Sequence, residues 1–485
     1  MRWTIQETAR ALGVPVPAGL APVARLAGVS IDSRAMGRGQ LFVAIHGPRH
    51  DGHDFVAAGF EAGAGAAVVA ADRVSSYPTE IVGRLFAVTD TVEALQKLAQ
   101  AVRRVWGRRI AAITGSVGKT TTKEILAALL GAKFGVLKSE GNLNNEYGLP
   151  LTLLRLEPED KAAVVELGMS HRGELRRLTE IAEPEVGVVT RVAPVHLEFF
   201  ASVDEIALAK RELIEGLAGP DPVAVLNADD PRVERFAEVT RGRVLTFGCG
   251  VGAQFRAEKI QDFGAAGSEF EFVGPNERAH LGLTLPGRHS VENALAALAA
   301  ASIWGIGAAD AADVFRHIQV GEMRGRLLEF AAGFALINDS YNSNPVALAA
   351  MVDLLAHTKA KNGNYRRRIL AAGEMLELGP DSPKLHREAG RHARSKRIDC
   401  IVAVQGNAAE VANGAMEAGL PPSQVHFFTD SAEAASFLAY FVQAGDLLLV
   451  KGSRGVKMER IVEELGAKYP LAAEVHAPPV PRGHH

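Results

Sequence analysis

The chain has 485 residues, a formal net charge of −3 and 47% hydrophobic residues. It is too long for one hydrophobic core and suggests about three domains, and its small net charge disfavours a nucleic-acid-binding surface. Two cysteines, Cys249 and Cys400, cannot form a disulfide framework, which favours a reducing cytoplasm. No signal peptide and no apolar run of about 20 residues is apparent, so no membrane insertion is expected.

Residues 1–86 alternate short predicted strands and helices, and we expect them to form a small α/β domain. Residues 29–34 and 40–45 are predicted strands. Ser33 and Arg34 close the first of them, where the arginine fork could hold an anionic group. A charged loop at 47–55 contains two histidines, and it is either a binding loop or merely solvated.

The most informative stretch is R-I-A-A-I-T-G-S-V-G-K-T-T-T, residues 109–122. Residues 110–114 form a short β-branched apolar run that predicts a buried strand, and residues 122–130 continue at helical spacing after a glycine-rich turn. Strand, glycine turn and helix together favour a phosphate-binding loop. The complete pattern would have glycine in place of Ile113, but the remaining residues still favour a nucleotide site over a bare turn. The loop residues are Gly115, Ser116, Val117, Gly118, Lys119, Thr120 and Thr121.

Several later residues could complete such a site. Lys119 would neutralise the β and γ phosphates, and the Thr120 hydroxyl would bind Mg²⁺. Glu166 ends a predicted buried strand, where a carboxylate needs a cation such as Mg²⁺ unless it is simply exposed. His196 lies in a loop and Lys210 in a helix, and by spacing alone a structural histidine and a solvated lysine are the simpler interpretations. The polar segment 139–150 is predicted to be an ordered turn.

The fold class follows from the βαβ rhythm, which predicts parallel sheets with right-handed crossovers through residues 87–320. The pattern restarts near 321, so residues 321–485 are predicted to form a separate Rossmann-like, doubly wound domain with four helices, and the tail from about 477 to be disordered. Three polar loops end strands of this domain, which predicts a substrate face at one sheet edge: 338–345, 373–379 and 450–455. The predicted fold is α/β with three domains: a small N-terminal α/β domain, a central P-loop mononucleotide-binding domain and the Rossmann-like one.

In chain order these motifs resemble the Mur ligase family. They are G-S-V-G-K-T-T, N-L-N-N-E-Y-G-L-P, E-L-G-M, H-L-E, A-K-R-E, P-G-R-H-S-V-E-N-A-L-A-A, D-S-Y-N-S-N-P and K-G-S-R. The resemblance covers essentially the whole chain apart from the tail. The family's phosphate loop also lacks the first glycine, which accounts for Ile113. Departures are Phe199, where glycine is frequent, and Glu374, where aspartate is commoner.

The resemblance implies an ATP-dependent ligase that forms an acyl phosphate on UDP-MurNAc-tripeptide and joins it to D-alanyl-D-alanine. L-F-V-A-I-H-G, D-G-H-D-F and G-E-M-L-E-L-G favour this branch of the family. The alternative is the branch that adds a single amino acid to UDP-MurNAc-dipeptide, although its D-N-P-R loop is absent where Asp339 begins D-S-Y-N-S-N-P. Folylpolyglutamate synthase lacks the uridine-type first domain, and a non-catalytic nucleotide-binding regulator would have no need of a second metal site. The sequence leaves open whether the third peptide residue is lysine or diaminopimelate.

The resemblance also implies roles for the candidate residues, with two Mg²⁺ ions. Lys119 and Thr120 would serve the γ-phosphate and the first ion, with Glu166 as a further ligand. His196 would hold the second ion, and Lys210 would carry a carbamate that turns a repelled cation into an oxygen ligand.

For the substrates, the resemblance implies that Asn293 contacts adenine, Arg326 the phosphate side of the nucleotide and Asp339 the ribose. Ser33 and Arg34 would bind the UDP group. A cytoplasmic monomer is expected.

Overall fold

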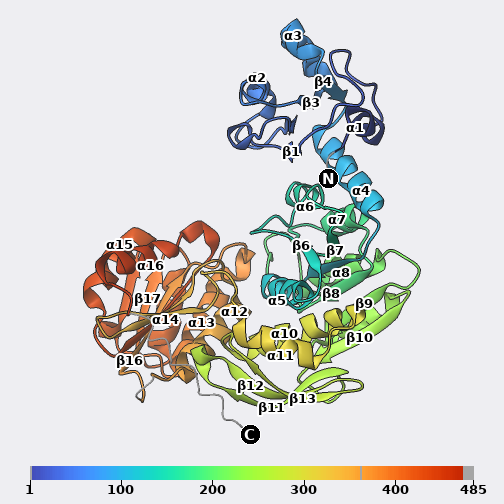
Figure 1. Ribbon diagram of the computed structural model, residues 1–485. Coiled ribbons are helices and arrows are strands. Elements are labelled where there is room, and N and C mark those ends of the chain that lie inside the picture. Colours follow the sequence, from blue (N-terminus) through green and yellow to red (C-terminus); the bar gives the residue numbers. More distant parts are fainter. Residues whose placement is uncertain (1–2, 361–362, 473–485) are drawn as a thin grey trace, which may run out of the picture.

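The chain folds around three β-sheets that follow one another in sequence, as seen in a computed structural model that describes residues 3–360 and 363–472 (Figure 1). In this view the N-terminal sheet lies at the top, the central sheet below it, and the C-terminal sheet beside the central one. The predicted α/β class with three domains is confirmed. The expected disordered tail from about 477 lies outside the described residues.

The N-terminal sheet has four parallel strands in the order β1-β2-β3-β4. They are β1 (Val29–Ser30), β2 (Leu41–Val43), β3 (Ala66–Ala70) and β4 (Leu85–Val88), with helices α1 (Ile5–Leu12), α2 (Val56–Glu61) and α3 (Thr79–Val82). The predicted strand at 29–34 is too long. The Asp32 side chain accepts a hydrogen bond from the Arg34 backbone and begins a 3-10 turn, η1 (Ser33–Ala35), so the strand ends at Ser30.

Helix α4 (Thr91–Trp106) joins the first sheet to the second. Its first half contributes Leu95 and Leu98 to the N-terminal core, and its second half contributes Val102 and Trp106 to the central core. The N-terminal sheet itself continues to Val88, two residues beyond the expected boundary at 86. One continuous helix therefore belongs to both cores.

The central sheet has nine strands in the order β13-β12-β11-β10-β9-β8-β5-β7-β6. They are β5 (Ile110–Thr114), β6 (Gly135–Lys138), β7 (Asp160–Glu166), β8 (Val186–Val189), β9 (Val223–Asn227), β10 (Arg243–Gly248), β11 (Phe255–Asp262), β12 (Ser268–Val273) and β13 (Arg278–Leu283). The expectation of parallel pairing is wrong for β11–β12 and β12–β13, which are antiparallel. Their short connections cannot span a crossover, so only a hairpin is possible.

Helices cover both faces of this sheet. They are α5 (Lys119–Gly131), α6 (Gly148–Leu153), α7 (Glu174–Ala182), α8 (Val203–Glu215), α9 (Pro231–Glu234), α10 (Arg288–Ala301) and α11 (Ala308–His317). Helix α10 packs along α5 in one core, and the alanine-rich sequence of α10 permits this close contact. Leucines of α7 and α8 fill the core on the other face.

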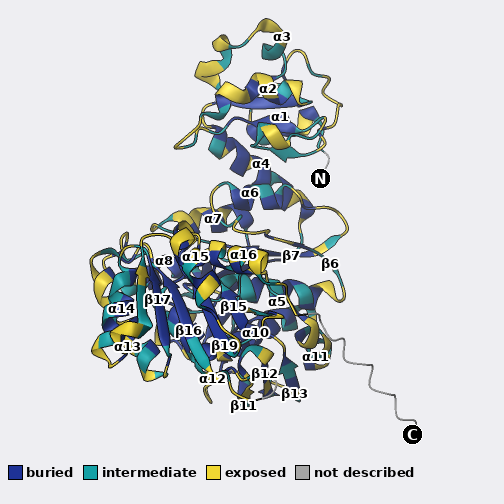
Figure 2. Cartoon of the chain, turned by 90° about the vertical axis from the view of Figure 1, so that its left-hand side faces the viewer, coloured by how far each residue is buried: buried dark blue, intermediate teal, exposed yellow. Residues whose placement is uncertain are grey.

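The C-terminal sheet has the order β14-β15-β19-β16-β17-β18, with only β14 antiparallel. Its strands are β14 (Arg326–Glu329), β15 (Ala335–Asp339), β16 (Arg367–Gly373), β17 (Cys400–Val404), β18 (Val425–Phe428) and β19 (Asp446–Lys451). The described part has five helices where four were expected: α12 (Pro345–His357), α13 (Ser382–Ser395), α14 (Ala408–Glu417), α15 (Ser431–Phe441) and α16 (Glu459–Lys468). They form two layers, and the inner strands β15, β19, β16 and β17 between them are largely buried, whereas the edge strands β14 and β18 are not (Figure 2).

None of the helices within 3–360 and 363–472 is both long enough and apolar enough to cross a lipid bilayer.

Candidate functional site

The phosphate loop connects β5 to α5 and needs glycine at two positions. Gly115 has φ 150°, and a Cβ there would come within 1.9 Å of Thr190 Oγ1. Gly118 has φ 86°, and a Cβ there would come within 2.3 Å of Asn293 Oδ1. Larger residues would be strained and would also collide with the walls of the site. The sequence-predicted loop is therefore present with its backbone tightly enclosed.

Hydrogen bonds with the segment that follows the neighbouring strand β8 hold the loop in shape. Thr190 Oγ1 donates to the Val117 carbonyl at 2.6 Å, and the Ser116 backbone donates to the Arg191 carbonyl at 2.7 Å. Ser116 Oγ also bonds the Ala193 carbonyl at 3.1 Å. Since these bonds use the amide and hydroxyl of Ser116 and the carbonyl of Val117, the amides near the start of α5 are left to bind an anion.

Lys119 begins α5 and lines the cavity. Its Nζ donates to the Gly115 carbonyl at 2.8 Å, which folds the side chain back over the loop. Burial lowers the pKa of Lys119; the Glu166 charge opposes this shift and the nearby Arg324 charge adds to it. A phosphate group would supply the negative charge that this environment favours.

Glu166 ends β7, directly beside the phosphate-loop strand, where it is only 3% exposed. Its Oε2 accepts a hydrogen bond from Thr120 Oγ1 at 2.8 Å, and its Oε1 accepts one from Asn144 Nδ2 at 2.9 Å. The buried-carboxylate interpretation thus agrees with the structure, and the exposed one does not. A carboxylate and a hydroxyl this close offer the oxygen ligands that Mg²⁺ prefers.

Asn144 was not singled out from the sequence, because its loop was interpreted as a turn. The loop does form turns: Asn145 Oδ1 accepts a hydrogen bond from the backbone N–H of Gly148, the first residue of α6. Asn144, however, lines the cavity and fixes the Glu166 carboxylate. The signal in the sequence that could have identified Asn144 was the group of three asparagines close to the predicted phosphate loop.

Of His196 and Lys210, only His196 is among the residues that line the cavity. His196 lines the cavity, with Nδ1 2.5 Å from Glu377 Oε2, and this hydrogen bond lowers the pKa of Glu377. Lys210, in α8, is only 2% exposed rather than solvated. Burial, followed by the charge of Lys119, lowers the pKa of Lys210 well below its ordinary value. The described residues contain no cluster of three or more His, Cys, Asp or Glu side chains able to hold a metal by themselves.

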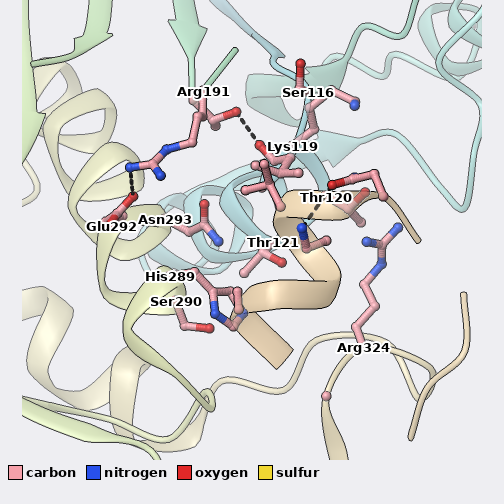
Figure 3. A pocket seen from close by; sticks show the side chains of 18 of the residues that line it. Ser116, Lys119, Thr120, Thr121, Arg191, His289, Ser290, Glu292, Asn293 and Arg324 are labelled. Atoms are coloured by element: carbon pink, nitrogen blue, oxygen red, sulfur yellow. Dashed lines mark hydrogen bonds and ion pairs between the residues drawn. The ribbon is translucent and has the colours of Figure 1, made fainter. Parts of the chain in front are cut away.

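The cavity has a volume of about 860 Å³ and lies between the central and C-terminal domains (Figure 3). Asn293 and His289 enter it from α10, and burial lowers the pKa of His289. From the C-terminal sheet, Asp339 Oδ2 accepts from Lys451 Nζ at 2.5 Å. The predicted adenine and ribose residues therefore line one cavity with the phosphate loop. Lys451, from the predicted substrate-face loop 450–455, lines it too, although the sequence had given that residue no role of its own.

The predicted phosphate residue Arg326 lies elsewhere. Its side chain is 50% exposed and pairs with Glu322 at 3.2 Å, and it is not among the residues that line the cavity. Arg324 does line it, stacked over the Tyr341 ring at 4.2 Å. In Figure 3, Arg324 lies across the pocket from Glu292 and Asn293, on the side of Thr120. A single residue, Gly325, separates the arginine that lines the cavity from the one that does not.

Ser33 and Arg34 lie in the N-terminal domain, which Figure 1 shows at the far end of the molecule from the C-terminal sheet. Neither lines the cavity. Arg34 is exposed, and its Nε and Nη2 bond the Asp32 carboxylate at 2.9 and 2.8 Å. The Arg34 guanidinium is thus paired with the neighbouring Asp32 carboxylate, at a site separate from the phosphate loop.

Three family models match the chain, described as Mur ligase family, catalytic domain (residues 25–103), Mur ligase middle domain (113–301) and Mur ligase, glutamate ligase domain (323–454). UDP-N-acetylmuramoyl-tripeptide–D-alanyl-D-alanine ligase of Bacillus subtilis is 35% identical over 90% of this chain and 93% of its own length. A crystal structure of MurF from Acinetobacter baumannii matches with a TM-score of 0.85 and 29% identity, covering 96% of this chain and 99% of that one. MurF ligase from Thermotoga maritima, solved in complex with ADP, matches with a TM-score of 0.77 and 28% identity, covering 91% and 97%.

Proposed function

Because the chain belongs to the Mur ligase family, we propose that it is an ATP-dependent ligase that joins D-alanyl-D-alanine to UDP-MurNAc-tripeptide in peptidoglycan precursor synthesis. The observation that carries the proposal is the convergence of phosphate loop, buried Glu166 and C-terminal strand ends on one cavity. Relatives named for this reaction match along nearly their whole length, which supports the same substrates here.

The proposed reaction has two steps. The carboxylate ending the tripeptide attacks the γ-phosphorus of ATP, the bond to the bridging oxygen breaks, and ADP leaves with an acyl phosphate formed. The amino group of D-alanyl-D-alanine then attacks the acyl carbon, phosphate leaves, and the nitrogen loses a proton to give the amide. Such phosphoryl transfer depends mainly on positioning and on neutralising charge. Lys119 and the loop amides supply both at the terminal phosphates.

For the metal, we assign Thr120 and Glu166 to one Mg²⁺, because their oxygens already meet and Asn144 fixes the second carboxylate oxygen. His196 and a carbamate on Lys210 are assigned to a second ion. Bound Mg²⁺ would neutralise phosphate charge and orient the γ-phosphate. The buried Lys210 amine suits carbamate formation because its lowered pKa favours the neutral, nucleophilic form.

For the nucleotide, we assign residues 115–121 to the phosphates, Asn293 to adenine and Asp339 to the ribose. The phosphate role expected of Arg326 fits Arg324 better, since only Arg324 lines the cavity. Ser33 and Arg34 are assigned to the UDP group. Residues 1–86 are assigned to binding of the UDP substrate, residues 87–320 to ATP binding, and residues 321–485 to ligation. We place the monomeric enzyme in the cytoplasm, where ATP is available and the free Cys249 and Cys400 stay reduced.

The decisive experiment measures ATP-dependent phosphate release with UDP-MurNAc-tripeptide or UDP-MurNAc-dipeptide, each offered D-alanyl-D-alanine or single amino acids in parallel. We expect phosphate release only when UDP-MurNAc-tripeptide and D-alanyl-D-alanine are both present. Release with a single amino acid on UDP-MurNAc-dipeptide would support the other family branch instead. Nucleotide binding without any release would support a regulator.

A further inference from the structure

A hydrogen bond between His196 and Glu377 joins the central and C-terminal domains at the cavity. His196 follows β8 of the central sheet, and Glu377 follows β16 of the C-terminal sheet. His196 Nδ1 and Glu377 Oε2 are 2.5 Å apart. A second bond runs from the Glu198 backbone N–H to the Glu377 carbonyl at 3.2 Å. The two loops are therefore linked through both side chain and backbone.

The backbone at this junction is set in an unusual conformation on both sides. His196 has φ 56° and Glu377 has φ 63°, values that residues other than glycine rarely adopt. Gly379 lies so close that a Cβ there would come within 3.0 Å of the Leu197 carbonyl. Conformations of this kind persist where the surroundings fix them, and they cluster at functional sites. The junction is thus more closely built than an incidental contact between surface loops.

The hydrogen bond also selects one tautomer of the histidine. An ionised carboxylate can only accept, so Nδ1 must carry the proton that it donates to Glu377. In the neutral imidazole, Nε2 then keeps its lone pair, on a ring that lines the cavity. A carboxylate behind the distal nitrogen is the usual way in which proteins orient a metal-binding histidine and raise its basicity.

We propose that Glu377 is a positioning residue that sets the orientation and tautomer of His196 for a divalent ion at the cavity. The proposal rests on the function proposed above, in which His196 holds the second ion. Because Glu377 belongs to the other domain, this ion site is complete only when the two domains meet. The second glutamate of G-E-M-L-E-L-G thereby acquires a role that its motif alone did not indicate.

The proposed role differs from that of a purely structural contact between the two domains, which we call a clasp. A clasp would need only the contact, and glutamine could largely preserve it because its carbonyl oxygen accepts the same hydrogen bond. Positioning for a metal also uses the negative charge, which strengthens the Nδ1–H donor bond and the basicity of Nε2. Glu377→Gln therefore separates the two roles, and Glu377→Ala removes both.

The test measures Mn²⁺ binding by electron paramagnetic resonance on the full chain with a non-hydrolysable ATP analogue, together with the radius of gyration from X-ray scattering. We expect two ions in the wild type. Glu377→Gln and Glu377→Ala should each weaken one of them by roughly ten- to a hundredfold, leaving the other unchanged. His196→Ala should weaken the same ion. Glu388→Gln, which changes an exposed glutamate of the same domain, should affect neither.

Unchanged affinities in Glu377→Gln, with or without a larger radius of gyration, would reduce the pair to a clasp and overturn the proposal. A wild type that binds one ion, with no effect of His196→Ala, would instead overturn the second metal site and the proposal with it. Loss of both ions in Glu377→Gln would indicate a general distortion of the cavity and also contradict the positioning role.

Discussion

At the scale of single residues, Arg324 forms no ion pair with any carboxylate in 3–360 or 363–472, although it lies on the wall of the phosphate site. An anion arriving there would meet an available guanidinium. We expect Arg324→Ala to lower kcat/KM for ATP by roughly ten- to a hundredfold, the equivalent of about 1.5–3 kcal/mol for a charge-assisted hydrogen bond. The matched control is Arg326→Ala, which removes an exposed pair and should change the same ratio by less than about fivefold. The reverse order of effects would restore Arg326 as the phosphate residue.

The proposed carbamate on Lys210 can be tested by chemical rescue of a variant that lacks the lysine. We expect Lys210→Ala to be nearly inactive but folded, because the oxygen ligand supplied by a carbamate is lost. Short carboxylic acids in the buffer should partly restore phosphate release by occupying the vacated space. Lys123→Ala serves as control: this lysine is equally buried but donates to the Ser139 carbonyl, and the acids should not rescue it. High activity of Lys210→Ala without any acid would exclude the carbamate.

At the scale of elements, the sequence predicts the bounds of a strand best where that strand is buried on both faces. The apolar runs 110–114 and 400–404 coincide with β5 and β17 because a central parallel strand needs no alternation. Strands such as β12 and β13 were missed, because exposed or half-buried residues interrupt their buried ones and their pairing depends on hairpins. The residues of the functional site likewise divide into those that the sequence predicts and those that it does not. Loop positions after buried strands were predictable, whereas the choice between Arg324 and Arg326 and the contact of Asn144 depend on tertiary packing.

The loop at 47–55, which the sequence left undecided between binding and solvation, is tied into the N-terminal domain. Asp51 accepts hydrogen bonds from the His53 backbone at 3.0 Å, from His53 Nδ1 at 2.6 Å and from Arg73 at 2.8 Å. His53 Nε2 in turn accepts from the Ala70 backbone at the end of β3. Partial burial alone would raise the pKa of Asp51, but the bonds from His53 and the nearby charges outweigh it and lower that pKa from 3.8 to about 2.

This lowered pKa predicts a pH-dependent contribution to stability. The folded state prefers ionised Asp51, so its contribution is present above pH 3.8 and is lost as the pH falls through about 2. We expect Asp51→Asn to destabilise the N-terminal domain at pH 7 by on the order of 1–2 kcal/mol, allowing for solvent screening. Hydrogen exchange of that domain should show the difference from wild type shrinking towards pH 2. Asp54→Asn, at an exposed neighbour, should show no such trend, and a constant difference for Asp51→Asn would refute the assignment.

At the scale of the whole molecule, none of the residues that line the phosphate cavity belongs to the N-terminal domain, which Figure 1 shows at the far end of the molecule from the C-terminal sheet. Helix α4 spans both cores, so the N-terminal domain is mounted on the central one by a continuous element. The cavity, by contrast, is walled by residues of the central and C-terminal domains. This arrangement supports the domain roles proposed above, in which the N-terminal domain binds the nucleotide-sugar end of the substrate and the other two domains perform the chemistry.

That division predicts an unequal effect of changing Arg34. We expect Arg34→Ala to raise KM for UDP-MurNAc-tripeptide by roughly ten- to a hundredfold, because a charge-assisted bond to an anion of about 1.5–3 kcal/mol is lost. KM for ATP should change by less than about twofold, since Arg34 does not line the ATP cavity. Arg10→Ala, at another exposed arginine of the same domain, should alter neither constant. Initial-rate measurements that vary each substrate in turn decide the matter: equal shifts in both constants would mean that the first domain does not bind the UDP end separately.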